Sequence, residues 1–139
     1  MSIVQTQTTS FKAELYQAIH DLTTDTIKIA LYTGDANLNE TTTAYSVSNE
    51  VTGTGYTAGG EVMTGVTIST SGFTAYVNFN NVLWNPASFT ARAALIYNSS
   101  KANRSIAVLD FGSDKTVTTQ FLITMPANTA TAALIRSSN

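Results

Sequence analysis

Residues 90–111 read TARAALIYNSSKANRSIAVLDF, two apolar runs separated by a polar break. The runs Thr90–Tyr97 and Arg104–Phe111 have the length and composition of β-strands, and the residues from Asn98 to Asn103 are of the kinds that form turns. The strand region of the chain lacks the crossover helices that a parallel sheet requires, so its strands are expected to form an antiparallel arrangement.

The same pattern of short strands and turns extends in both directions along the chain. Strands are predicted at 26–32, 61–70, 73–84 (bent or broken around Asn80–Asn81), 116–125 and 131–136, with breaks at Ser71-Gly72, Asn85-Pro86 and Gly112-Ser113-Asp114. Such spacing predicts a mainly β fold, an antiparallel β-sandwich or a jelly-roll-like barrel.

One N-terminal helix is predicted from apolar residues at spacings of four, four and three: Phe11, Leu15, Ile19 and Leu22. Ser10 is the expected N-cap, and Glu14 lies near the positive end of the helix dipole.

The chain is expected to form one domain over residues 1–139. Its length allows about two-thirds of the unfolded surface to be buried. Residues 1–9 have no core-facing pattern and are predicted to be an extended arm that orders on a partner. Residues 33–60 are polar and rich in Gly, Asn and Thr, and form a long loop of the kind that is usually functional or interface-forming.

Composition excludes several classes of function. The absence of cysteine excludes disulfides, thiolate zinc sites and cysteine nucleophiles. The first residues lack the pattern of a secretory signal, and no apolar run is long enough to span a bilayer. A net charge of −2 gives no support for nucleic-acid binding.

Only 12% of the residues are charged, against about 25% in ordinary soluble domains. A weakly charged, hydroxyl-rich surface loses its water at low cost and suits broad protein contacts; a strand-rich protein with a preference for threonine would have the same composition. Residues 1–70 carry most of the carboxylates and residues 71–139 most of the cations. The unlike halves could meet across copies of an assembly, or folding could interleave them.

The segment GTGYTAGG at 53–60 matches a dinucleotide-binding fingerprint through Gly53, Gly55 and Ala58. That fingerprint requires a following helix to hold the pyrophosphate, and here a strand pattern follows instead. The segment is therefore predicted to be a loop that needs positive φ angles and tight turns.

The candidates for chemistry are few. His20 is the single histidine, and a transition-metal site would need more ligands of its kind. A Ser-His-Asp triad has no G-x-S-x-G motif to support it. Asp110 and Asp114 are a candidate for a glycosidase pair of carboxylates, but they are expected to flank a hairpin turn, DFGSD. Asp35 to Glu40 departs from the calcium-loop pattern, because Glu40 stands where glycine is required.

Ten aromatic residues were considered as a sugar-binding face: Tyr45, Tyr56, Phe73, Tyr76, Phe79, Trp84, Phe89, Tyr97, Phe111 and Phe121. Their strand spacing predicts that most are core residues, and Trp84, at a strand end, is the candidate for partial exposure. No catalytic, cofactor-binding or metal-binding residue is predicted.

Three ordered segments carry a resemblance: FKAELYQAIHDLTTDTIKIALYTGDANL (11–38), NEVTGTGYTAGGEVMTG (49–65) and ARAALIYNSSKANRSIAVLDFGSDKTV (91–117). Together they resemble a family of small virion structural proteins of tailed bacteriophages. The resemblance implies a β-rich particle component without catalytic residues.

The resemblance leads to an expected function, location and set of partners. The function is that of a capsid decoration or cement protein, made in the host cytoplasm and located on the capsid exterior of the virion. Its partners would be the major capsid protein and further copies of itself, as a dimer or trimer, with no cofactor, nucleic acid or membrane. The alternatives are a tail, baseplate or fibre-associated protein, then a carbohydrate-binding module, and then an enzyme built around His20.

Overall fold

The structure, a computed structural model, describes residues 2–138. It is mainly β, with 43% of the residues in strands and 6% in helix. The elements in chain order are β1 (Thr6–Gln7), α1 (Thr9–Tyr16), β2 (Ile27–Tyr32), β3 (Glu61–Val62), β4 (Thr67–Ser71), β5 (Thr74–Asn78), β6 (Val82–Trp84), β7 (Phe89–Asn98), β8 (Arg104–Val117), β9 (Phe121–Ile123) and β10 (Ile135–Ser137). The predicted class, an antiparallel sandwich-like fold with one N-terminal helix, is confirmed.

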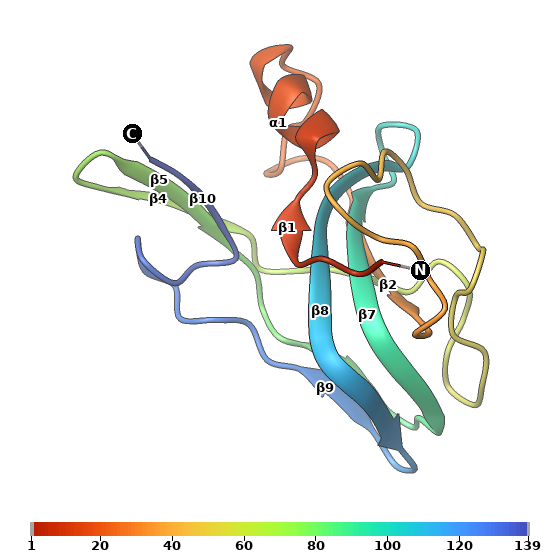
Figure 1. The fold of residues 1–139 in the computed structure, drawn as a ribbon. Coiled ribbons are helices and arrows are strands. Elements are labelled where there is room, and N and C mark those ends of the chain that lie inside the picture. Colours follow the sequence, from red (N-terminus) through yellow and green to blue (C-terminus); the bar gives the residue numbers. More distant parts are fainter. Residues whose placement is uncertain (1, 139) are drawn as a thin grey trace.

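The first layer is a five-stranded sheet in the order β1-β8-β7-β2-β3 (Figure 1). Its centre is the hairpin of β7 and β8, which pairs Leu95 with Val108 and Asn98 with Arg104. Both strands were predicted, at 90–97 and 104–111, with the break between them. Strand β2 pairs with the other side of β7 along all six of its residues, as the predicted strand at 26–32 requires.

The second layer consists of two small sheets, β10-β5-β4 and β6-β9. Strands β4 and β5 form a hairpin whose two-residue turn is Gly72-Phe73, at the predicted break. The predicted bend in 73–84 is also confirmed, because β5 ends at Asn78 and β6 begins at Val82 in the other small sheet.

Two apolar clusters lie on opposite faces of the large sheet. The inner cluster joins Ile29 and Ile96 of the large sheet to Trp84, Phe121 and other residues of the second layer. The outer cluster is smaller: Ala30, Tyr32, Ala36, Leu38, Ala93, Leu95, Tyr97 and Val108. Both faces of β2 and β7 are therefore buried.

The long loop, residues 33–60, begins on the outer face of the large sheet and reaches the inner cluster at Val51 and Tyr56. It contains no named strand and touches the rest of the chain through isolated bridges such as Tyr32 with Glu50. Ala36 and Leu38 of this loop are buried in the outer cluster. The predicted polar loop is thus present, and a few apolar residues fasten it to the sheet.

The helix differs from its prediction at both ends. The N-cap is Thr8, whose hydroxyl accepts a hydrogen bond from the Phe11 amide, and not Ser10. The helix ends at Tyr16, and Ala18 takes a φ of 58° where the chain reverses. Leu22 therefore lies beyond the helix, although the reversed chain returns it to the same cluster as Phe11.

The predicted hairpin at DFGSD was wrong, because β8 continues through it to Val117. Ala93 pairs with Asp110 and Ala91 with Lys115, so four residues of β8 bulge out opposite the single residue between the two alanines. A bulge lets one strand bend while its partner continues. The segment has the composition of a turn, and that composition does not distinguish a bulge from a hairpin.

Other strand boundaries moved where the chain crosses between layers. The predicted strand 61–70 splits into β3 in the large sheet and β4 in a small one. The predicted strand 116–125 likewise divides between β8 and β9, and the predicted strand 131–136 begins only at Ile135. An apolar pattern continues across a layer crossing because both sides of the crossing face the same core.

The N-terminal arm is extended, as predicted, but it orders on its own chain. Thr6 and Gln7 pair with Val108 and Ala107 at the edge of β8. Thr8 is fully buried. The expectation that the arm orders only on a partner was therefore wrong, and backbone hydrogen bonds to β8 are the reason.

Candidate binding groove

The glycine-rich segment 53–60 is a close-packed loop. A Cβ atom on Gly55 would overlap the Pro86 carbonyl, and one on Gly60 would overlap the Ile29 carbonyl. Both residues have positive φ angles, 86° and 79°. The segment therefore needs glycine for tight turning and close backbone approach, in agreement with the structural interpretation.

Glu50 fixes this loop to the sheet. Its carboxylate accepts hydrogen bonds from the Tyr45 hydroxyl (2.6 Å), the Gly59 amide (2.8 Å) and the Tyr56 hydroxyl. Burial raises the pKa of Tyr45 and Tyr56, and the neighbouring Glu50 carboxylate adds to this effect. The same two causes raise the pKa of Tyr97 to about 12. All three hydroxyls stay protonated near neutral pH, so this cluster donates hydrogen bonds that hold the loop.

His20 lies at the base of the helical segment. Its Nε2 is 2.8 Å from the Glu14 carboxylate and its Nδ1 is 3.0 Å from the Asn98 side-chain nitrogen. The imidazole is fully buried, and it lines neither of the two hollows described below. An enzyme built on His20 would require it to face a cleft, and the structure does not place it there.

Asp110 and Asp114 lie at the bulge of β8. The Arg92 guanidinium is 3.8 Å from both Asp110 and Asp114, through Nε and Nη1 respectively. The Asp110 carboxylate also accepts a hydrogen bond from the Gly112 amide. The two carboxylates therefore surround one arginine on the surface and do not face each other across a cleft.

The other metal candidate behaves as a local turn. The Asn39 side chain accepts hydrogen bonds from the amide and the hydroxyl of Thr41. Within residues 2–138, no group of three or more histidine, aspartate or glutamate side chains is close enough to hold a metal ion.

Most of the aromatic residues belong to the core, as predicted. Trp84, the candidate for partial exposure, is a core residue too, because its side chain packs between Tyr56 and Phe121 and only 2% of the residue is exposed. Tyr76 is half-buried, and the strongly exposed aromatic residues are Phe73 and Tyr16. These two lie on separate elements, so the described residues form no aromatic row for a sugar.

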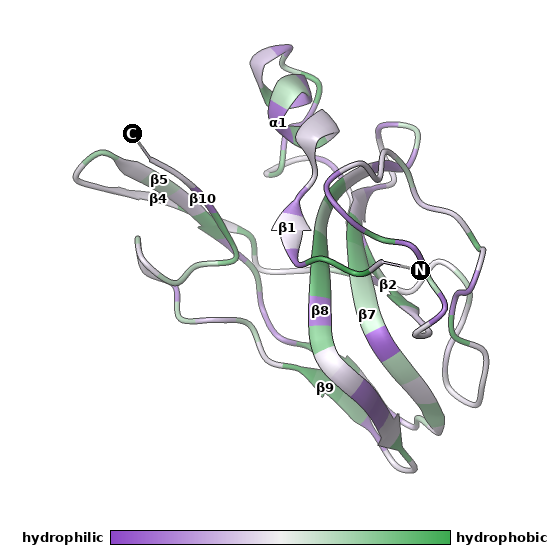
Figure 2. Cartoon of the chain, viewed as in Figure 1, coloured by the Kyte–Doolittle hydropathy of each residue, from purple (hydrophilic) through white to green (hydrophobic). Residues whose placement is uncertain are grey.

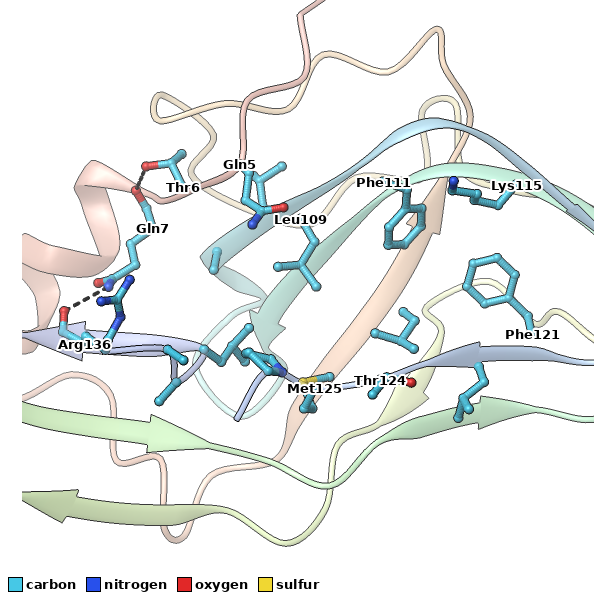
Figure 3. A pocket seen from close by; sticks show the side chains of 18 of the residues that line it. Gln5, Thr6, Gln7, Leu109, Phe111, Lys115, Phe121, Thr124, Met125 and Arg136 are labelled. Atoms are coloured by element: carbon cyan, nitrogen blue, oxygen red, sulfur yellow. Dashed lines mark hydrogen bonds between the residues drawn. The ribbon is translucent and has the colours of Figure 1, made fainter. Parts of the chain in front are cut away.

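A hollow of about 910 Å³ forms an apolar groove between the two layers (Figure 3). One wall is the inner side of β8 with Leu109, Phe111 and Val117. The opposite wall is the segment from Phe121 to Met125, and Ala133 and Leu134 continue it toward β10. The sandwich is therefore open along one side.

The groove has free strand edges along its rim. Within residues 2–138, the outer side of β8 is paired by β1 at Ala107 and Val108 and by an isolated bridge from Ala44 to Arg104, so the part of β8 beyond Asp110 has no strand on that side. Strand β9 pairs with β6 on one side alone in the same part of the chain. Near the arm, side chains complete the rim: Gln5 accepts a hydrogen bond from the Asp110 amide (3.0 Å), and Gln7 donates one to the Arg136 carbonyl (3.2 Å). Gln7 thereby links the two layers at that end.

Charge in the groove has one sign. Of the residues that line it, only Lys115 and Arg136 are charged, and Figure 3 shows them toward opposite ends of the groove. An apolar floor with free strand edges and cationic ends can hold an extended chain segment that carries acidic groups at its ends.

An uncharged run in the sequence corresponds to this groove. From Thr116 to Ile135 the chain has no charged residue, and Lys115 and Arg136 flank that run directly. The fold brings these two residues to the ends of one hollow. A second hollow, of about 190 Å³, lies beneath the long loop beside Tyr32 and Leu38.

These features define an open-sided antiparallel β-sandwich with an apolar interlayer groove. The chain matches no protein-family model, and searches of curated proteins and of solved structures found no significant similarity. In residues 2–138 no helix is long and apolar enough to cross a membrane.

Proposed function

We propose that this chain is a structural protein of a tailed-phage virion, a capsid decoration or cement protein that bridges capsid subunits on the outside of the head. The observation that carries the proposal is the open groove, because it offers apolar surface and strand edges to another protein. The low charge content and the resemblance in 11–117 add to it. The major capsid protein is the proposed partner, and a dimer or trimer is the proposed state.

The proposed mechanism is mechanical. A protein that binds the assembled shell but not the loosened one shifts the equilibrium toward the intact shell. Contacts with several subunits add through avidity, so that each one can be modest.

The arm and the long loop remain the proposed contact segments beside the groove. Both have one side committed to their own sheet, so they would contribute the residues that point outward. Val4 on the arm and Val47 on the loop are 42% and 65% exposed. If hydrogen exchange on a capsid-bound sample shows no protection of either segment, the arm and the long loop are not part of the contact surface.

The first test is the copy number in purified virions, measured by quantitative mass spectrometry against the major capsid protein. We expect near parity or a simple fraction of the capsid lattice. A handful of copies per particle would contradict the decoration role and favour a tail, baseplate or fibre-associated protein.

The second test is rebinding to capsids that lack the protein. A Phe111→Lys substitution places a cation on the groove wall and should reduce rebinding strongly, whereas Val62→Lys, at a 51% exposed position outside the groove, should not. Circular dichroism and thermal unfolding would confirm that both variants fold. Equal rebinding of the two folded variants would remove the groove from the capsid contact.

A further inference from the structure

Within residues 2–138, β4 is an edge strand with no strand paired to its outer side. It is the last strand in the order β10-β5-β4, and its five residues TISTS pair only with β5. In an antiparallel strand every second residue directs its N–H and C=O groups outward. The outer edge of β4 therefore presents a row of backbone donors and acceptors for another strand.

Monomeric proteins usually protect such edges with lysine, proline or a bulge. Strand β4 has none of these protections: it contains no charged residue and no proline, and its register with β5 is regular from Thr67 to Ser71. The neutral region is larger than the strand, because the chain carries no charge from Val62 to Ala91. The edge therefore has no element that would repel a second strand.

The shape of the region also makes the edge accessible. Figure 1 shows β4, β5 and β10 extending as a ribbon away from the large sheet, and in Figure 2 strands β4 and β5 have pale and green shades. Ile68 on β4 is 52% exposed and Phe73 at the hairpin turn is 88% exposed. Exposed apolar side chains on a ribbon with an open edge are typical of a surface that another chain covers.

We propose that β4 pairs antiparallel with β4 of a second copy of this chain. A two-fold axis at Ser69 would place Ile68 of each copy opposite Thr70 of the other, joining two three-stranded sheets into one sheet of six strands. A second copy fits because its edge is equally neutral and small-residued, so that the contact buries no unpaired charge. The groove takes no part in this contact, so the dimer does not depend on the proposed function.

A cysteine placed at the two-fold axis tests the geometry. The chain has no cysteine of its own, so Ser69→Cys would carry a single thiol. We expect mild oxidation to convert this variant to a disulfide-linked dimer much faster than Ser48→Cys, whose site is an exposed position on the long loop. Equal rates of cross-linking for the two variants would overturn the proposal.

The oligomeric state tests the energetics. Sedimentation equilibrium of the unmodified protein should show a monomer that becomes a dimer as concentration rises. Ile68→Lys should shift this equilibrium at least tenfold toward monomer, because it places two like charges beside the axis, and Val47→Lys on the long loop should leave it unchanged. A protein that stays monomeric at its highest soluble concentration, or a folded Ile68→Lys variant that dimerises normally, would refute the pairing.

Discussion

Glu50 shows how a single buried residue organises the long loop. It is 6% exposed, and both of its carboxylate oxygens accept hydrogen bonds. Tyr56 also contacts the sheet, because its hydroxyl oxygen accepts a hydrogen bond from the Leu31 amide of β2 at 2.9 Å. One tyrosine thus joins a loop carboxylate to a strand amide, and the loop is held by polar contacts as well as by its apolar residues.

Tyr56→Phe should therefore destabilise the protein. The substitution removes one hydroxyl and leaves the Leu31 amide and one Glu50 oxygen short of a partner, which costs about 1–3 kcal/mol. Urea unfolding measures the change. Tyr16→Phe is the control, because Tyr16 is 94% exposed and should give no change. Equal stability of both variants would show that the contact with Glu50 contributes nothing.

Asp25 should make stability depend on acid pH. Burial alone would raise the pKa of its carboxyl, but hydrogen bonds from the Asn98 side chain, the Asp21 amide and Lys101 outweigh burial and lower the pKa to about 2. A carboxyl with a lowered folded-state pKa stabilises the protein above its unfolded pKa of 3.8, and this contribution is lost as the pH falls toward 2. The loss should be on the order of 1 kcal/mol after solvent screening.

Unfolding curves between pH 5 and about pH 2 would measure this dependence. The Asp25→Asn variant should lose stability less steeply over that window than the unmodified protein. The pKa of Asp21 is also lowered, mainly by hydrogen bonds from Thr23, so Asp21→Asn serves as the comparison. Identical slopes for Asp25→Asn and the unmodified protein would contradict the assignment to Asp25.

Two glycines in the connections between elements differ in why glycine is needed, one because of lack of space and the other because of backbone strain. Gly60 and Gly72 both have positive φ angles, 79° and 59°. An added Cβ on Gly60 would overlap the Ile29 carbonyl of β2, whereas nothing lies within 4 Å of one on Gly72 in the hairpin turn. The first glycine is required by contact between the loop and the strand, and the second by the turn alone.

Gly60→Ala should accordingly cost about 3 kcal/mol or more, because the loop must move away from β2. Gly72→Ala should cost only about 1–2 kcal/mol, the penalty of a left-handed backbone for an L-residue. Thermal and urea unfolding of the two variants give the comparison. A Gly72→Ala variant that is as unstable as Gly60→Ala would mean that steric space at position 60 is not the deciding factor.

At the scale of the whole molecule, charge is confined to part of the architecture. Strands β4, β5, β6 and β9 lie within the uncharged runs 62–91 and 116–135. The five-stranded sheet carries charges, including Arg92 and Asp110 at the bulge. Apart from Arg136 on β10, the second layer thus has the neutral character of a protein interface, while the other charged groups lie elsewhere.

The arm is expected to close one end of the groove and to protect the edge of β8. Removing residues 2–7 deletes the pairing of β1 with β8 and the link from Gln7 to Arg136, while Thr8 keeps its place as N-cap. The truncated protein should be less stable by about 1–3 kcal/mol. It should also bind a dye for exposed apolar surface more strongly.

A double variant, Gln5→Ala with Gln7→Ala, keeps the backbone pairing and removes only the side-chain contacts. We expect its stability and dye binding to fall between those of the full chain and the truncated one. If truncation changes neither property, the arm has no part in closing the sandwich.

The fold class and the two central strands could be predicted from the sequence. The apolar runs in 90–111 and 26–32 are long enough to be strands, and the turn residues between 98 and 103 leave antiparallel pairing as the remaining arrangement. Local chemistry also identified the β4–β5 turn and the structural role of the glycine-rich segment. These features depend on residues close together in the chain, and that is why they could be predicted.

Only the tertiary structure decided which strands share a sheet and where the sandwich stays open. The layer crossings at 63–66 and 118–120 are invisible in an apolar pattern that continues across them, and the bulge of β8 has the composition of a turn. Likewise, it is the fold that brings Lys115 and Arg136 to opposite ends of one hollow. Contacts between residues far apart in the chain follow from packing of the whole core, and no local pattern encodes them.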